Sequence, residues 1–175
     1  ESHTLFDGDI TRYPETHFLD FVVDGRSFRD VVDGGRGQVT ELCRPWLDTV
    51  PESVERLLGR QETPGLPEDR VALLVCLVCG DLGCGAITAR LSISEDQVTW
   101  SEFAWEDGDG DPTPVDVRLE GDDRLVFSRA AYESLLASAP DRIAAMPYEE
   151  LEHRGRRFLW PWQWGWRLPR SDTRE

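Results

Sequence analysis

Three of the four cysteines in this chain lie within nine positions, in the stretch VCLVCGDLGCGA at residues 75–86. Cys76, Cys79 and Cys84 follow the spacing C-x2-C-x4-C, and a glycine comes directly after Cys79 and after Cys84. Thiolates bind zinc and iron, paired thiols form disulfides, and free thiols pack as small hydrophobic groups. The stretch therefore predicts a metal site, a redox pair or a hairpin that carries structural thiols.

Two geometries distinguish these alternatives. In a regular β-hairpin with a four-residue turn, Cys79 lies opposite Cys84, while Cys76 lies opposite Ile87 on the core face, so the sulfurs separate as two and one. In a metal knuckle the chain leaves strand geometry, Gly80 adopts a conformation that other residues resist, and all three sulfurs face one ion. The direction of the Cys76 sulfur decides between the two geometries.

A structural zinc site takes four ligands, and this stretch supplies three. The candidates for a fourth ligand are the remaining cysteine, Cys43, and the histidines His3, His17 and His153. A zinc ribbon offers two C-x2-C pairs, whereas this chain has one pair and a single further cysteine. The sequence alone brings none of the four candidates near the stretch.

Three interpretations of the cysteines follow, in order of preference. We favour structural thiols, and hence no cofactor. The second interpretation is a zinc or iron site formed by Cys76, Cys79 and Cys84, with Cys43 as the further ligand. The third is a reversible redox pair formed by Cys79 and Cys84, since a cytosolic disulfide is usually transient.

The same stretch carries a resemblance. The layout CGDLGCG at residues 79–85 followed by VTW at residues 98–100 resembles small uncharacterised proteins of actinobacteria, which carry a Cys-Gly hairpin followed by a Val-x-Trp strand. The resemblance implies the hairpin and implies no particular activity.

The elements on either side of the cysteines have strand patterns. Residues 71–79 are apolar on both faces, which is typical of a strand in the middle of a sheet. Residues 86–94 alternate between apolar and polar side chains, and residues 98–105 give a third strand. We therefore expect an antiparallel meander that spans residues 71–105.

The apolar alternation also predicts the register of this meander. If residues 94–97 form the loop, Val98 lies opposite Ile93 and Trp100 lies opposite Leu91, so the apolar faces coincide. A slip of one residue would put the indole on the polar face. We expect the register that keeps Trp100 in the core.

Further elements complete an α+β fold. Asp24-Gly25 predicts a tight turn, Ser128 an N-cap, and Pro51 the first turn of a helix. We expect a single antiparallel sheet, built from hairpins and the meander at 71–105, with short helices on one side. The expected hairpins span 17–32 and 116–127, and the expected helices span 50–60, 128–140 and 146–154.

The C-terminal segment, residues 154–175, is rich in Trp and Arg, and follows an acidic α+β domain at 1–153. Its four tryptophans recur at every second position, so an extended segment presents all of them on one face. We favour an interpretation in which this face packs on the same domain, because large apolar patches are rarely left exposed. The alternative is a docking surface for a partner or a membrane interface. The four residues are Trp160, Trp162, Trp164 and Trp166.

Charge excludes some classes of function. The chain carries a net charge of −15, and because residues 154–175 contribute +4, the remainder carries −19. Affinity for nucleic acid comes from clustered Arg and Lys, so we expect no nucleic-acid binding. The apolar run at 71–79 is too short for a transmembrane helix, and the cysteines do not suggest a secreted disulfide framework. We expect a cytoplasmic protein.

No recognised catalytic motif occurs, and no residue stands out as a nucleophile or a base. The leading functional prediction is therefore a non-catalytic protein-interaction module, similar in kind to an immunity protein or inhibitor, whose acidic surface selects a basic protein partner. The alternative is a small zinc- or iron-binding protein that uses the cysteine hairpin, and the second alternative is a thiol redox protein. The sequence makes no prediction of oligomeric state.

Overall fold

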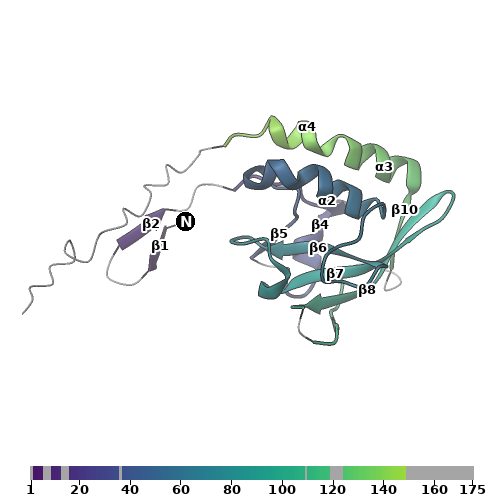
Figure 1. Ribbon diagram of the computed structural model, residues 1–175, viewed down its shortest axis with the longest axis horizontal. Coiled ribbons are helices and arrows are strands. Elements are labelled where there is room, and N and C mark those ends of the chain that lie inside the picture. The colour runs from purple at the N-terminus through teal and green to yellow at the C-terminus, as the bar shows by residue number, and fades with distance from the viewer. Residues whose placement is uncertain are drawn as a thin grey trace, which may run out of the picture.

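The computed structural model describes residues 2–5, 9–12, 16–35, 37–108, 110–118 and 124–148 (Figure 1). Within these ranges no helix is long and apolar enough to cross a membrane. The strands are β1 (Ser2–Leu5), β2 (Asp9–Arg12), β3 (Val22–Val23), β4 (Arg26–Ser27), β5 (Gln38–Val39), β6 (Arg70–Cys76), β7 (Ala86–Ile93), β8 (Gln97–Glu106), β9 (Thr113–Pro114) and β10 (Arg124–Ser128). The helices are α1 (Phe28–Val31), α2 (Val50–Leu57), α3 (Arg129–Ala137) and α4 (Ala139–Ala144), with 3₁₀ helices η1 (Arg44–Thr49) and η2 (Leu82–Cys84).

The fold is α+β and antiparallel, but the expected single sheet is wrong. A six-stranded sheet has the order β10-β8-β7-β6-β5, with β9 also paired to β8. Two separate two-stranded ribbons, β1-β2 and β3-β4, lie outside it. The turn predicted at Asp24-Gly25 is present, with φ of 49° and 76°, but its strands are two residues long because the chain enters α1 at Phe28.

Within the meander β6-β7-β8, the turn between β7 and β8 has the predicted register. Leu91 pairs with Trp100 and Ile93 pairs with Val98, so the prediction for this turn is confirmed. Trp100 is 1% exposed in this register. A slip of one residue would have moved this large side chain out of the core. A register shift between Thr88 and Arg90 then bends the sheet further along.

The hairpin expected at 116–127 is wrong for the residues that the structure describes. Val117 forms an isolated bridge with Val32, and β10 pairs with β8 instead. The strand pattern of residues 124–127 was therefore read correctly, but its partner lies earlier in the chain. The helix expected at 146–154 and the segment 154–175, with its four tryptophans, lie mostly or entirely outside the described residues.

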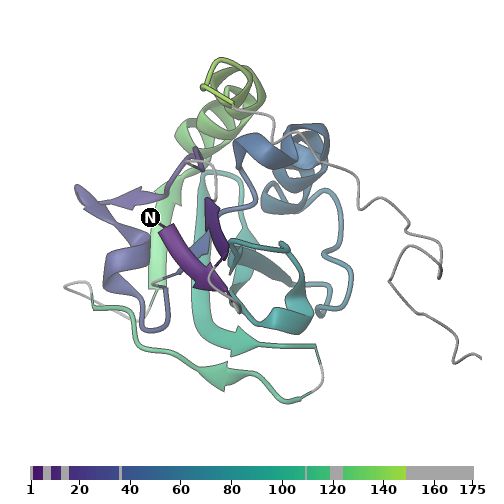
Figure 2. The ribbon, with the colours of Figure 1, turned by 90° about the vertical axis from the view of Figure 1, so that its left-hand side faces the viewer.

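Helices α2, α3 and α4 contact one another and lie together above the six-stranded sheet in Figures 1 and 2. The prediction of α2 is confirmed: it has Pro51 in its first turn, and Gly59, with φ of +65°, follows its end. The region expected as one helix at 128–140 forms two helices. The first helix ends with Ser138 as its C-cap, and α4 begins directly after this residue with Pro140 in its first turn. Ser128 is the N-cap residue of α3 by position, although its side chain makes no capping hydrogen bond.

Trp100 is the centre of the main core. The rings of Phe21, Phe28, Phe127 and Tyr132 surround the indole, with centroid separations from 4.9 to 6.1 Å. These four rings come from four different parts of the chain: α1, β10, α3 and the segment before β3. Edge-to-face aromatic pairs of this kind each contribute about 0.5–1.5 kcal/mol beyond the burial of their surface.

Tyr132 gives this core its polar connection. Its hydroxyl accepts a hydrogen bond from Trp100 Nε1 at 3.2 Å and donates one to the backbone oxygen of Leu57 at 2.9 Å. The two bonds join β8, α3 and α2 in the interior. The N–H of the indole, which would be costly to bury without a partner, is satisfied in the same arrangement.

A buried ion pair lies between β6 and β8. Arg70 Nε donates to Glu106 Oε1 at 2.5 Å, and the two side chains are 6% and 7% exposed. Thr88 accepts a hydrogen bond from Arg70 and donates one to Glu106, while the backbone oxygen of Glu102 accepts another from Arg70. These bonds satisfy charges that burial would otherwise penalise by several kcal/mol per ion.

Two glycines with nearly the same backbone conformation allow a test of the packing at Gly85. Gly85 has φ of +87°, and an added Cβ would lie 1.9 Å from Trp105. Gly37 has φ of +89° and nothing within 4 Å of such an atom. We expect Gly37→Ala to cost about 1–2 kcal/mol of unfolding free energy through φ alone, and Gly85→Ala to cost about 1–3 kcal/mol more through the clash.

Urea denaturation at equilibrium measures both free energies, with the slope of each transition checked against that of the wild type. Equal losses in the two variants would contradict the packing of Trp105 on Gly85.

Candidate metal centre

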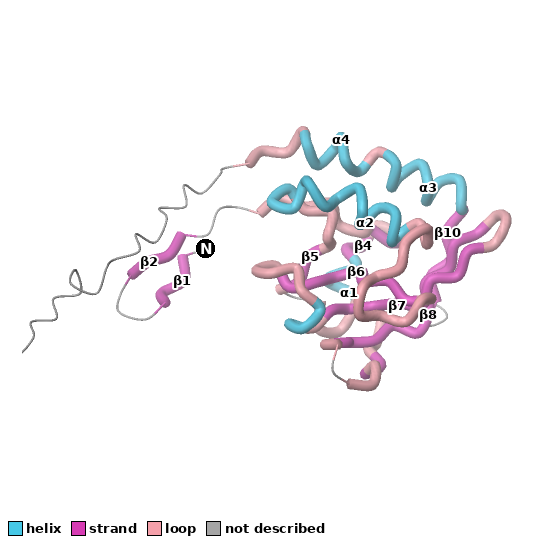
Figure 3. The backbone as a smooth tube through the Cα atoms, viewed as in Figure 1, coloured by secondary structure: helices cyan, strands magenta, loops and turns pink. Residues whose placement is uncertain are grey.

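The cysteine stretch forms a loop at the end of β6. The strand ends at Cys76, and residues 77–79 form a turn that leads to η2 and then to β7 (Figure 3). Leu74, and not Cys76, pairs with Ile87, and Cys76 pairs instead with Gln38 of β5. The predicted pairing of Cys76 with Ile87 in a regular hairpin is therefore wrong.

The three sulfurs converge. The Sγ atoms of Cys76, Cys79 and Cys84 all lie within 4.8 Å of one another. Those of Cys79 and Cys84 are 3.1 Å apart. Cys76 is half-buried, whereas Cys79 and Cys84 are exposed. The sulfurs therefore converge, as the knuckle alternative requires, and the two-and-one separation of the regular hairpin is wrong.

Backbone hydrogen bonds hold the first half of the loop. The N–H of Gly80 donates to the backbone oxygen of Cys76 at 2.9 Å, which closes the turn. Gly80 has φ of +66°, a conformation that costs other residues about 1–2 kcal/mol. Hydrogen bonding from the backbone N–H groups of Cys79 and Val78 lowers the pKa of the Cys76 thiol.

A side-chain cap orders the second half of the loop. Asp81 Oδ1 accepts a hydrogen bond from the N–H of Gly83 at 2.6 Å, at the start of η2. The N–H of Gly85 then donates to the backbone oxygen of Leu82 at 2.7 Å. These bonds place Cys84 in the short 3₁₀ turn. From there its sulfur lies 3.1 Å from that of Cys79.

Two indoles pack against the glycines of the loop. An added Cβ at Gly80 would lie 3.2 Å from the Trp46 ring, and one at Gly85 would lie 1.9 Å from the Trp105 ring. Trp46 comes from η1 and Trp105 from β8, so distant parts of the sequence hold the two ends of the loop. Beneath the loop, Trp46 belongs to a second apolar cluster, separate from the main core, which also contains Leu66, Ala72, Val75, Leu82 and Ala86.

The shared environment separates the acidities of the thiols. The backbone N–H groups of Cys79 and Val78 lower the pKa of Cys76 because they stabilise its thiolate. Hydrogen bonding and charge from Cys79 raise the pKa of Cys84 to about 11. Since the three groups interact, their protons leave in steps that belong to the cluster.

The arrangement fits a tetrahedral metal ion. Zinc–sulfur bonds of about 2.3 Å in tetrahedral geometry place sulfurs about 3.8 Å apart. The sulfurs of Cys79 and Cys84 would separate by less than about 1 Å to reach that spacing from 3.1 Å. Three close cysteines of this kind can hold a metal ion, and hydrogen bonds from backbone N–H groups to a ligating sulfur are the outer contacts that support such sites.

Cys43, which the sequence offered as the further ligand, is not part of the cluster. It is fully buried, forms an isolated bridge with Phe18, and burial raises its pKa to about 11. His17 is half-buried and also lies outside the cluster. The side chain of His3 and the whole of His153 are outside the described residues, as are the four tryptophans proposed as a docking surface.

Sequence reasoning missed Trp46 and Trp105. Both are ordinary aromatic residues in the sequence, with no spacing that relates them to the cysteines. The only local signal was the glycine after Cys79 and the glycine after Cys84, since a glycine in such a place often marks a close approach of another group. That signal identifies the positions and not the partners.

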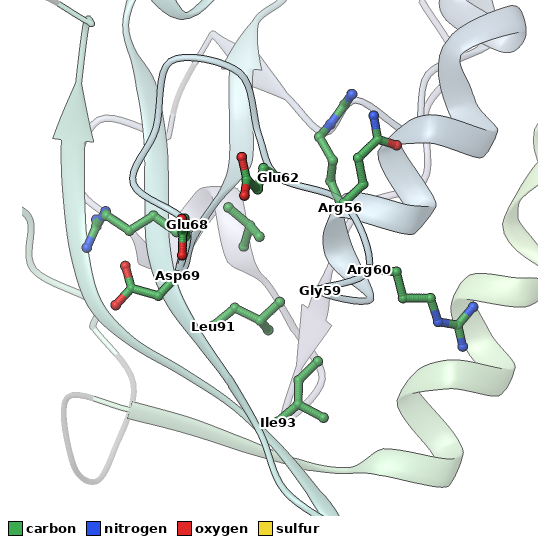
Figure 4. Close-up of a pocket in the computed structure, with 11 residues that line it drawn as sticks. Arg56, Gly59, Arg60, Glu62, Glu68, Asp69, Leu91 and Ile93 are labelled. Atoms are coloured by element: carbon green, nitrogen blue, oxygen red, sulfur yellow. The ribbon is translucent and has the colours of Figure 1, made fainter.

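A surface pocket of about 510 Å³ lies between α2 and the start of β6 (Figure 4). Four of its charged side chains pair with residues outside the pocket: Arg56 with Glu41, Arg60 with Glu55, Asp69 with Arg90 and Arg70 with Glu106. In Figure 4 the side chain of Arg60 points away from the carboxylates on the opposite wall. Since most of its charged side chains pair with residues outside it, this pocket is a weaker candidate than the cysteine cluster.

Comparisons with family models, with curated proteins and with solved structures found no match for the chain. The assignment of this site therefore depends on its own geometry and chemistry.

The acidities and exposures of the thiols give a labelling prediction for the metal-free, reduced protein. Iodoacetamide alkylates thiolates, and a lowered pKa means that the thiolate persists to lower pH, so Cys76 should label at lower pH than Cys84. Cys43 should label only after unfolding, because it is buried. Mass spectrometry of peptides after labelling across a pH series measures each site. Labelling of Cys43 in the native protein, or of Cys84 at lower pH than Cys76, would contradict the described geometry.

Proposed function

We propose that the protein is a small metalloprotein that binds one zinc ion through Cys76, Cys79 and Cys84. The observation that carries the proposal is the convergence of three sulfurs at the end of β6. A chain that needed only structural thiols has no reason to leave strand geometry and expose two of them to solvent. Thiolates favour zinc among the common divalent ions, because zinc is softer than magnesium or calcium.

A tetrahedral zinc ion takes one more donor. Within the described residues, no other Cys, His, Asp or Glu joins the cluster. The remaining candidates are His3 and His153, whose side chains lie outside the described residues, or a water molecule that completes the site as it does in catalytic zinc centres. Substitution of each histidine by alanine, followed by a zinc titration, identifies the donor.

We expect the reduced protein, purified without chelator, to contain about one zinc per chain by elemental analysis. Loss of an outer contact typically weakens metal binding by about 10- to 100-fold. Cys79→Ser should weaken zinc binding by more than this, since it removes a direct ligand. Cys43→Ala is the matched control, because it also removes one cysteine and should keep the metal. Substitution with cobalt adds an independent readout, since tetrahedral cobalt bound to thiolates absorbs strongly.

Three outcomes count against the proposal. Less than about half an equivalent of metal after reconstitution, with all three loop thiols reacting freely, would exclude the site. Retention of wild-type affinity in Cys79→Ser would exclude this ligand set. One equivalent of iron in place of zinc would keep the site and overturn the choice of metal.

The acidic composition supports a second proposal, a non-catalytic module that binds a basic protein as an immunity protein or inhibitor does. The net charge of −15 favours fast encounter with a positively charged partner. This function is compatible with a structural metal site, since it depends on the overall charge and not on the thiols.

We expect a pull-down from the native organism to recover a basic protein whose binding weakens as the salt concentration rises, because surface charge interactions are screened. Cys79→Ser, if it folds, serves as the control that separates this binding from the metal site. Recovery of acidic partners alone, or binding that is insensitive to salt, would contradict the second proposal.

A further inference from the structure

The thiols of Cys79 and Cys84 form a close pair that is more accessible than the Cys76 thiol. Their sulfurs are 3.1 Å apart, and both side chains are exposed. A disulfide bond has a length of about 2.05 Å, so an approach of about 1 Å would close it. The third sulfur, that of Cys76, is half-buried and receives hydrogen bonds from backbone N–H groups.

The loop can accommodate that approach. Gly80 follows Cys79 and Gly85 follows Cys84, and both glycines already adopt φ values that only glycine adopts easily. The two cysteines are five positions apart, in a loop that lies outside the strands. Closing the disulfide therefore moves the loop and leaves the hydrogen bonds of β6 and β7 in place.

We propose that the Cys79–Cys84 pair is a site of oxidation by peroxides and that formation of its disulfide releases the metal. The inference rests on the proposed zinc function. A disulfide sulfur carries no thiolate charge, so the ion would keep only the thiolate of Cys76 and its fourth donor. One thiolate does not hold zinc against solvent, because the affinity of such sites depends on the full set of deprotonated ligands.

The chemistry balances with hydrogen peroxide as the oxidant. The thiolate of one cysteine attacks a peroxide oxygen, the oxygen–oxygen bond breaks, and hydroxide leaves, which gives a sulfenic acid. The second thiolate attacks that sulfur, the sulfur–sulfur bond forms, the sulfur–oxygen bond breaks, and a second hydroxide leaves. Two protons from solvent convert the hydroxides to water. Two electrons pass from the sulfurs to the peroxide, and the zinc ion is neither oxidised nor reduced.

The test uses the full chain loaded with zinc. Hydrogen peroxide is added, the free zinc is measured with a chromogenic chelator, and thiols are counted in parallel. We expect one zinc released for every two thiols lost, a Cys79–Cys84 disulfide in the peptide map, and recovery of zinc binding after reduction with dithiothreitol. Cys43→Ala is the matched control and should give the same result, because Cys43 is buried away from the loop.

Cys76→Ser separates this inference from the zinc proposal. It should lose the metal and still form the Cys79–Cys84 disulfide with peroxide, because the pair does not need the third sulfur. Failure of the wild-type protein to bind zinc overturns the proposed function. Zinc binding that survives peroxide, a disulfide that includes Cys76, or oxidation of the loop thiols to sulfinic acid without a disulfide overturns the inference and leaves the zinc site intact.

Discussion

The cysteine loop depends on the contacts of two glycines with two indole rings. Gly80 lies against Trp46 and Gly85 lies against Trp105, so each end of the loop is fixed by a large rigid group from another part of the chain. Neither contact tolerates a side chain at the glycine without movement, and both glycines also have positive φ. A loop on the surface with exposed thiols has little apolar surface of its own to bury, and these two contacts supply its packing. The convergence of the sulfurs follows from them.

The elements around the site were predictable where the pattern was local. The alternation in β7 gave both the strand and its register against β8, because a slip would have exposed Trp100. The turn at Asp24-Gly25 was also readable, since few other residue pairs adopt its conformation. The single sheet was wrong for a different reason. Which strand pairs with which depends on long-range contacts, such as the bridge of Val117 to Val32, and apolar alternation carries no information about the partner.

The sequence predicted which cysteines form the candidate site, but it did not predict the geometry of their loop. The spacing of the cysteines identified the three that converge, and the glycine after Cys79 identified the place where a strand could end. The regular hairpin, one of the two geometries that the sequence left open, failed because it assumed that β6 continues past Cys76. The strand ends there because Gly80 closes a turn onto Cys76, and Trp46, more than thirty positions earlier, covers that turn. Cys43 was set aside by the same kind of long-range information, since burial is decided by the whole fold.

Charge and sulfur have different consequences for the choice of ion. A net charge of −15 raises the local concentration of any cation near the protein, and this attraction does not distinguish magnesium from zinc. Selection has to come from the ligands, and carboxylates, which the chain has in abundance, favour the hard ions that are already common in cells. Among the residues that the structure describes, no carboxylate joins the cluster: Asp81, the acidic residue inside the loop, directs its oxygen to the N–H of Gly83 and away from ligation. Three sulfurs without a carboxylate therefore bias an acidic protein toward a soft ion, and the same sulfurs make the site sensitive to oxidants in a way that an oxygen site would not be.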